Sequence, residues 1–140
     1  MDIIHRPLFA PDLLVNALGQ DPGRPLLNIL GGAMLSVGEV RDSTSQFCQA
    51  LRSLGLTKGW RIGLLSSNRP EVLILANAVQ ISAAIYVPMH PLAGFNDHLH
   101  VVTDADIDVL VFDAEHYSER AAALAEHVPD LQLLAFGKSD

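Results

Sequence analysis

The stretch RIGLLSSNRPEVLILANAVQISAAIYV, residues 61–87, decides the fold, because a strand, a helix and a second strand follow one another within it. Residues 61–65 form a short apolar run, which the polar residues 66–68 interrupt. Residues 70–82 begin with proline, whose missing N–H has no helical partner in a first turn, and they are apolar almost all round. Residues 84–87 predict the second strand. This order indicates a right-handed crossover and a parallel sheet.

The chain continues the same alternation after Pro88, which we expect to end the second strand. Residues 96–103 predict a helix with a weak pattern, and residues 115–128 predict a helix with alanines at its centre. Residues 107–112 are mostly β-branched and aliphatic, which is typical of a strand covered on both faces. Residues 131–136 predict a last strand. Four strands alternating with three helices indicate an α/β fold, a parallel βαβ sheet with flanking helices.

A β-hairpin precedes this sheet. The apolar residues 27–30 and 33–35 flank Gly31-Gly32. A primed two-residue turn needs positive φ at its central positions, which glycine adopts without strain. We therefore predict such a turn at the two glycines.

Ser36 and Glu39 have the spacing of a capping box, in which each side chain satisfies a backbone N–H of the other residue. The helix behind them has an apolar stripe with a 3.6-residue period and a stop signal at Gly55. Cys48, the only cysteine, lies on that stripe, so we interpret it as a packed core thiol. A single cysteine forms no internal disulfide and no metal cluster.

Residues 1–25 contain four prolines around one short helical pattern, residues 12–18, which Gly19 ends. We predict that residues 1–25 are a lead-in segment and that residues 26–140 form a single α/β subdomain.

The composition, with 49% hydrophobic and 18% charged residues, excludes a disordered chain. From Asp97 onward, ten acidic residues are opposed only by Arg120 and Lys138, so residues 97–140 carry a net charge of −8 and residues 1–96 carry +1. Because the chain has no stripe of Lys and Arg residues, we do not expect it to bind nucleic acid. The acidic residues after Asp97 predict a solvated acidic face. No apolar run is long enough for a transmembrane segment, and the N-terminus has no signal-peptide pattern, so we expect a cytoplasmic protein.

Three candidate sites arise from the residues themselves. Ser66, Ser67 and Arg69 precede a helix N-terminus and could meet an anion, but we favour ordinary helix capping for them. His98 and His100, with His90 and Asp97 nearby, contain metal-ligand types, but an i, i+2 pair does not fit one face of the predicted helix, and we favour solvated histidines.

The third candidate is a phospho-acceptor of the receiver type, formed by Asp113 at a strand end and Lys138. That fold also needs carboxylates after its first strand to hold a hard cation, and residues 66–68 supply none. We therefore assign no catalytic residue and no metal ligand.

Four motifs stand in a familiar order: LSVGEV (35–40), ALRSLGLTKGWRI (50–62), NRPE (68–71) and AIYVPMHP (84–91). Together they resemble the N-terminal part of the adenylate-forming (AMP-binding) superfamily, of the acyl-CoA synthetase or fatty-acid-CoA ligase type, over about residues 26–112. The chain departs from the usual family residues at four positions. This chain has Val37 where the family usually has Tyr, Trp60 where it has Asp, Ala83 where it has Gly, and His90 where Asn is common.

The resemblance implies an enzyme that activates a carboxylic (fatty) acid with ATP and Mg²⁺ to an acyl-adenylate and then transfers the acyl group to CoA. The family's phosphate loop and catalytic lysine do not occur in residues 1–140. We therefore expect a segment cut from a longer enzyme, inactive alone and without a cofactor of its own. The alternative is a stand-alone α/β binding or interaction module without catalysis.

The resemblance also suggests Asn68, Arg69 and His90 as residues near the acid-binding cleft. An apolar surface left bare by the missing part is expected to support a homodimer, through residues 70–82 or 131–136.

Overall fold

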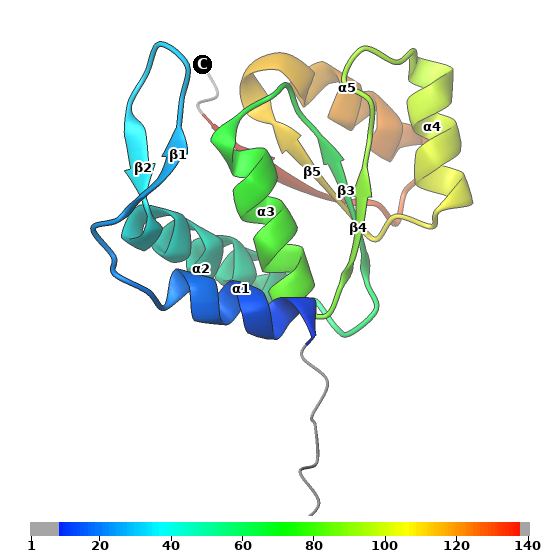
Figure 1. The fold of residues 1–140 in the computed structure, drawn as a ribbon. Helices are drawn as coiled ribbons and strands as arrows, with labels where there is room; N and C mark the ends of the chain where they lie inside the picture. The colour runs from blue at the N-terminus through cyan, green and yellow to red at the C-terminus, as the bar shows by residue number, and fades with distance from the viewer. Residues whose placement is uncertain (1–8, 138–140) are drawn as a thin grey trace, which may run out of the picture.

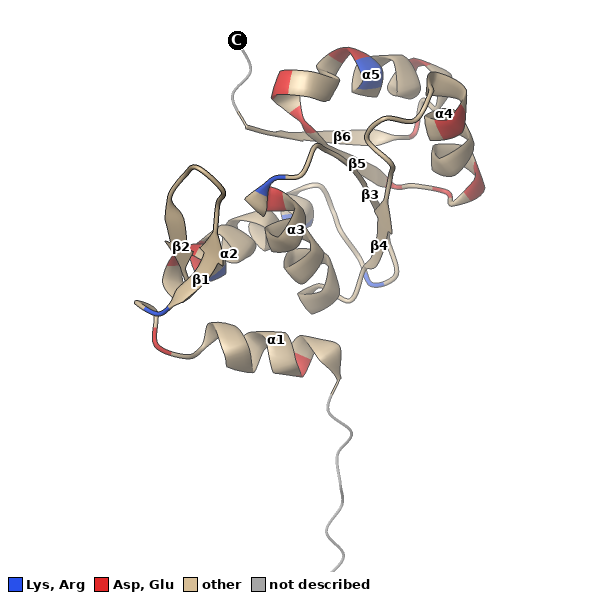
Figure 2. Cartoon of the chain, turned by 45° about the horizontal axis from the view of Figure 1, so that its top comes forward, with Lys and Arg blue, Asp and Glu red and all other residues tan. Residues whose placement is uncertain are grey.

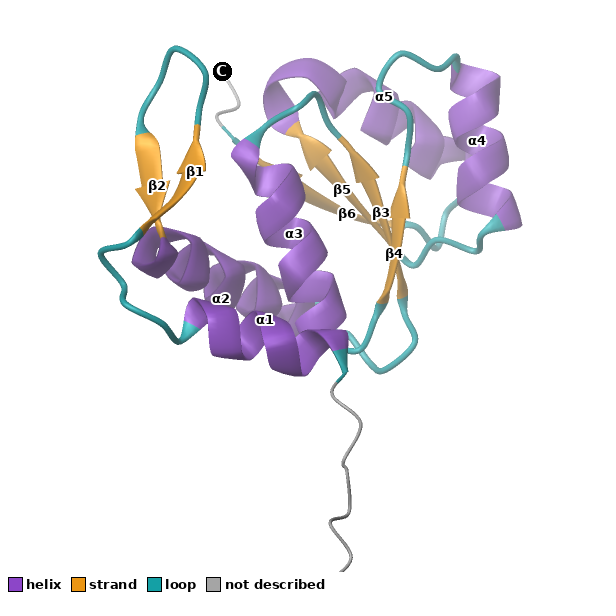
Figure 3. Ribbon diagram, viewed as in Figure 1, coloured by secondary structure: helices purple, strands orange, loops and turns teal. Residues whose placement is uncertain are grey.

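The computed structural model describes residues 9–137, which form helices packed on both faces of a small sheet, with a separate hairpin beside them (Figures 1 and 3). Residues 1–8 of the predicted lead-in segment, and Lys138 of the phospho-acceptor candidate, lie outside the described residues. The elements are α1 (Ala10–Leu18), β1 (Pro25–Asn28), β2 (Met34–Ser36), α2 (Val37–Ser53), β3 (Arg61–Leu65), α3 (Pro70–Ile81), β4 (Ile85–Pro88), α4 (Phe95–Asp104), β5 (Val109–Asp113), α5 (Ala114–His127) and β6 (Gln132–Phe136).

The main sheet has four parallel strands in the order β4-β3-β5-β6. β3 lies at the centre, with Ile62 opposite both Tyr86 of β4 and Val109 of β5. β3, β4 and β5 are each followed by a helix that returns the chain to the start of the next strand, which is the arrangement that a parallel sheet requires. The predicted α/β class and parallel topology are confirmed.

β5 shows why the apolar run around it predicted a strand covered on both faces. All five of its residues are buried. Val109 and Val111 pack toward α2 and α3, whereas Leu110 and Phe112 pack toward α4 and α5. Because successive side chains of a strand point to opposite faces, β5 contributes to two cores at once. Figure 3 shows the two helix pairs on opposite sides of the sheet.

A third apolar cluster joins α1 to the rest of the molecule. Leu18 of α1, Val40 of α2 and Ile74 of α3 are buried together, with Leu27 and Leu35 of the hairpin packed against them. α1 starts at Ala10, two residues before the predicted helix, with Pro11 in its first turn. The predicted lead-in therefore contains a helix that supplies core contacts.

The hairpin forms, but the predicted two-residue turn is wrong. β1 and β2 pair antiparallel with Asn28 opposite Met34, which leaves residues 29–33 as the loop. Only Gly31 has positive φ, at 72°, so the glycine pair does not supply the two left-handed residues of a primed turn. The N–H of Gly32 instead donates to the Ile29 carbonyl at 2.9 Å inside the longer loop.

The bounds of β4, β5 and β6 differ by one or two residues from those predicted. Pro88 is the last residue of β4 instead of its stop, which an edge strand tolerates because the missing N–H faces no partner there. β5 starts at Val109 instead of residue 107. Just before β5, the Asp108 side chain accepts a hydrogen bond from the Arg61 N–H at 2.7 Å, and the Asp108 backbone bonds to Arg61 and Gln132.

Acidic residues of the segment 97–137 gather on α4 and α5, on one side of the sheet, as Figure 2 shows. Within residues 9–137, no helix has both the length and the apolar character needed to cross a membrane.

Candidate functional site

The polar loop after β3 meets the start of α5 at the carboxyl ends of the central strands. Arg69 is the N-cap of α3, but its side chain makes no capping hydrogen bond. Ser67 donates from Oγ to Asp113 Oδ2 at 3.4 Å. The loop side chains therefore reach across to β5 instead of capping the helix that follows them.

Asp113 is the centre of this arrangement, at the end of β5, and its side chain is fully buried. Its Oδ1 accepts from Arg69 Nη1 at 3.0 Å and from the Glu115 N–H at 3.1 Å. Its Oδ2 lies 2.9 Å from His116 Nδ1. Burial would raise the pKa of Asp113, but the hydrogen bonds from His116 and the Glu115 N–H, together with Arg69, hold that pKa below its usual value. Asp113 is therefore a buried carboxylate that stays ionised.

Arg69 joins three carboxylates. Besides Asp113, its Nη1 lies 3.4 Å from Glu115 Oε2 and its Nε lies 3.5 Å from Glu71 Oε2. The guanidinium also stands over the Phe136 ring, 5.8 Å from the centroid. Burial works to lower the pKa of Arg69, but the three carboxylates raise it above its usual value. We call Arg69, Asp113, Glu115 and His116 the carboxyl-end cluster. The cluster connects the loop after β3 to the end of β5. In it, Arg69 forms ion pairs with carboxylates of this same chain.

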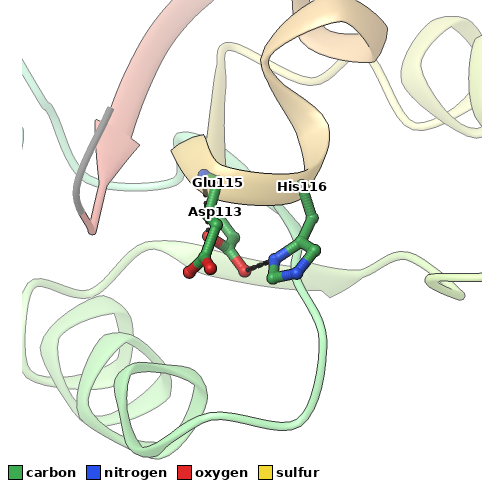
Figure 4. A group of neighbouring side chains, drawn as sticks. All are labelled: Asp113, Glu115 and His116. Atoms are coloured by element: carbon green, nitrogen blue, oxygen red, sulfur yellow. Dashed lines mark hydrogen bonds and ion pairs between the residues drawn. The ribbon is translucent and has the colours of Figure 1, made fainter. Parts of the chain in front are cut away.

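The cluster brings together Asp113, Glu115 and His116, whose possible ligand atoms lie within 4.8 Å of one another (Figure 4). These three residues do not fit the Mg²⁺ that the family resemblance implies. Mg²⁺ prefers an all-oxygen shell, whereas one member is an imidazole and Arg69 already holds the cationic position. The sequence singles out Asp113 only as a candidate phospho-acceptor, not as a member of this group. A strand that ends in Asp-Ala-Glu-His at a helix start is the signal that points to the group.

The histidines of the second candidate site are not gathered as ligands. His98 is buried, which corrects our interpretation of it as a solvated residue. Its Nδ1 lies 2.8 Å from Arg120 Nη1 and its Nε2 lies 2.8 Å from the His90 carbonyl oxygen. Because arginine only donates, Nδ1 is the acceptor and the proton is on Nε2. His98 thereby connects α4, α5 and the loop after β4.

His90 and His100 are exposed, as predicted for solvated histidines. The His90 Nδ1 accepts from the Leu92 N–H at 3.2 Å. Asp97 caps its own helix by accepting from the Gly94 N–H at 3.1 Å. His90 and His98 meet through a backbone carbonyl and not through their two rings.

A groove of about 570 Å³ separates the hairpin from α3, and Asn68 and Arg69 line one part of it. Most of its other lining is apolar, with Leu27, Leu73 and Tyr86 among the residues. Burial raises the pKa of the Tyr86 hydroxyl. His90 is not among the lining residues, so the structure joins two of the three cleft candidates and leaves the third apart.

Cys48 lies in the core as predicted. Its side chain is buried, and its Sγ lies 3.7 Å from the Ala78 carbonyl oxygen and 3.6 Å from Ser82 Oγ.

Curated relatives match nearly the whole chain. The medium/long-chain-fatty-acid–CoA ligase FadD8 of Mycobacterium tuberculosis is 39% identical over 132 residues, which cover 94% of this chain and 23% of FadD8. A medium/long-chain-fatty-acid–CoA/3-oxocholest-4-en-26-oate–CoA ligase of Mycolicibacterium smegmatis is 27% identical over 88% of this chain and 22% of its own length. The chain thus spans about a quarter of the length of these relatives.

Solved structures share the fold. A Rhodopseudomonas palustris protein assigned as a long-chain-fatty-acid CoA ligase superposes with a TM-score of 0.81 at 21% identity, over 93% of this chain and 33% of that one. ATP-bound MatB from Rhodopseudomonas palustris superposes with a TM-score of 0.78 at 22% identity, over 91% of this chain and 25% of MatB. The family model of the AMP-binding enzymes matches residues 15–138. The chain belongs to the family of AMP-binding enzymes.

Proposed function

We propose that this chain is part of an acid–CoA ligase, which activates a fatty acid with ATP to an acyl-adenylate and then forms the CoA thioester. The observation that carries the proposal is the family match over residues 15–138, together with the fatty-acid–CoA ligase names of the relatives. ATP, Mg²⁺ and CoA are the cofactors that this activity requires.

Within that enzyme, the chain supplies framework and not reacting groups. The buried carboxylate of Asp113 and the guanidinium of Arg69 form an ion pair at 3.0 Å. The buried histidine His98 has both ring nitrogens engaged. We therefore expect the chain alone to be inactive, and we expect the whole enzyme to be cytoplasmic.

A graft tests the ligase proposal. The aligned region of FadD8 is replaced by this chain, and CoA-thioester formation from decanoate, ATP, Mg²⁺ and CoA is followed by mass spectrometry. The graft is expected to make decanoyl-CoA. A graft that folds, as judged by its circular dichroism, but makes no thioester from any medium- or long-chain acid would refute the proposal.

Asn68, Arg69 and His90 are proposed to stand near the acid in the whole enzyme. The groove beside Asn68 has mostly apolar walls, which suit an acyl chain. In the graft, Asn68→Ala is expected to raise KM for decanoate with little change in kcat. The exposed Asn96 of α4 provides the matched control, and equal effects of Asn68→Ala and Asn96→Ala would remove Asn68 from the cleft.

A homodimer is proposed through the apolar surface next to the same groove. Leu73 of α3 and Leu30 of the hairpin loop line the groove and are exposed large apolar residues. Light scattering of the 140-residue chain should report a dimer that Leu73→Glu dissociates. Leu13→Glu, at an apolar residue of α1 that is also exposed, should leave the dimer intact. A monomer at high concentration contradicts this.

A further inference from the structure

A second groove lies between α1, α2 and the end of α3. Its volume is about 440 Å³, within the range of pockets that take small ligands. The groove is lined by Val15, Leu18, Gly19, Arg41, Thr44, Ser45, Cys48, Gln49, Arg52 and Ile81. Ile81 ends α3 and Arg69 precedes its start, so the helix of 12 residues, about 18 Å long, separates this groove from the carboxyl-end cluster.

The groove has an apolar floor and a polar wall. Leu18 and Cys48 are each 7% exposed and form the floor with Ile81. The wall is one face of α2, because Arg41, Ser45, Gln49 and Arg52 are spaced close to whole helical turns. The two arginines are eleven residues apart in the sequence, which places them about 16 Å apart along the helix axis.

The charge of this groove is opposite to that of the molecule. The chain carries a net charge of −7, yet the lining contains two arginines and no acidic residue. Arg41 pairs with Asp42 at 3.0 Å, but both side chains are exposed, and such a pair is weak. Arg52 makes no ion pair with any residue between 9 and 137. Cationic groups beside an apolar floor are complementary to a molecule with an anionic head and an apolar tail.

We propose that this groove binds a free medium-chain carboxylate, with the carboxylate on Arg52 and the acyl chain along Leu18, Cys48 and Ile81. The inference goes beyond the proposed ligase function, since it uses only the lining of the groove and the groove lies at the other end of α3. The inference describes this groove between α1 and α2 as a binding site and gives it no catalytic step.

Amide NMR of the 140-residue chain during titration with sodium decanoate tests this inference. The expected result is a saturable set of shifts centred on Val15, Ser45 and Gln49, with weaker binding of the neutral 1-decanol. Arg52→Gln should weaken decanoate binding about tenfold, the scale of one charge-assisted hydrogen bond. Lys58→Gln removes the same charge from an exposed turn outside the lining and should leave the affinity unchanged.

A variant that fills the groove tests whether decanoate binding needs the cavity itself in addition to the charge of Arg52. Ser45 is exposed, so Ser45→Phe fills the groove without changing the core, and it should abolish the shifts while the melting temperature stays constant. The proposal is overturned if decanoate shifts lie elsewhere, or if Lys58→Gln weakens binding as much as Arg52→Gln. It is also overturned if only phosphatidylglycerol vesicles bind at this face, or if a second copy of the chain occupies the groove, seen as a dimer that Arg52→Gln dissociates.

Discussion

Arg69 and Asp113 carry the strongest prediction at the scale of single residues. Replacing Arg69 by Met leaves the buried Asp113 carboxylate without its guanidinium, and we expect the free energy of unfolding to fall by about 1–3 kcal/mol. Arg41→Met removes an exposed pair with Asp42 and should cost less than about 1 kcal/mol. Urea denaturation at pH 7 measures both, and equal losses would show that the cluster adds no stability.

The same carboxylate predicts a pH dependence. The pKa of Asp113 is lower in the folded chain than the value of about 3.9 in an unfolded one. Its contribution is therefore fully present above the unfolded pKa and is lost as the pH falls through the folded pKa. Urea midpoints between neutral pH and pH values below the unfolded pKa should fall more steeply for the wild type than for Asp113→Asn. Parallel curves for the two proteins would contradict the ionised, hydrogen-bonded state of Asp113.

His98 predicts a contrast between two histidines of one helix. His98→Leu removes the hydrogen bonds that join the His90 carbonyl and Arg120 to the buried ring, although the Ala93 backbone still contacts both groups. We expect a loss of about 1–3 kcal/mol in the free energy of unfolding, because one of the two lost bonds has a charged donor. His100→Leu changes an exposed residue and should have little effect. A His100 variant that is as unstable as the His98 variant would refute the buried connection between α4 and α5.

At the scale of elements, the start of α2 is the part that its sequence predicts best. Ser36 Oγ accepts from the Glu39 N–H at 3.3 Å, and Glu39 Oε2 accepts from the Ser36 N–H at 2.8 Å, as the capping-box spacing predicts. These bonds to Ser36 lower the pKa of Glu39. Ser36→Ala should reduce the free energy of unfolding by about 1 kcal/mol, whereas the exposed Ser45→Ala on the same helix should not. Thermal melts that do not separate the two variants would contradict this.

Local patterns succeed where the partner groups are close in the sequence and fail where they are distant. The capping box joins residues three apart, so its spacing alone is sufficient. The hairpin turn depends on which residues of β1 and β2 pair, and Asn28 pairs with Met34 across a longer loop than the two glycines suggest. Likewise, the bond from the Arg61 N–H to the Asp108 side chain joins residues of two different strands, and no local pattern contains it.

At the scale of the whole molecule, the alternation of strands and helices was sufficient to predict the parallel sheet. The carboxyl-end cluster was not predicted, because Arg69 and Asp113 are 44 residues apart and meet only once β3 and β5 pair. The prediction of a solvated His98 is wrong for a related reason: the ring contacts Arg120 of α5, which lies 22 residues further along the chain.

We predict that α1 contributes to the stability of the whole molecule through its buried contact with α2 and α3. Leu18 is buried with Val40 and Ile74, so Leu18→Ala should lower the free energy of unfolding by about 2–4 kcal/mol. Leu13→Ala, on the exposed side of α1, should be nearly neutral. Equal urea midpoints for these two variants would show that residues 1–25 are only a lead-in, as first expected from their prolines.

The claim that this chain supplies framework to a ligase, and no reacting group, has one direct test. The 140-residue chain is incubated with ATP, Mg²⁺ and a panel of fatty acids, and pyrophosphate release is followed. We predict no release above the blank that lacks protein, while the FadD8 graft carrying the same residues turns over. Release above that blank by the chain alone would contradict the claim.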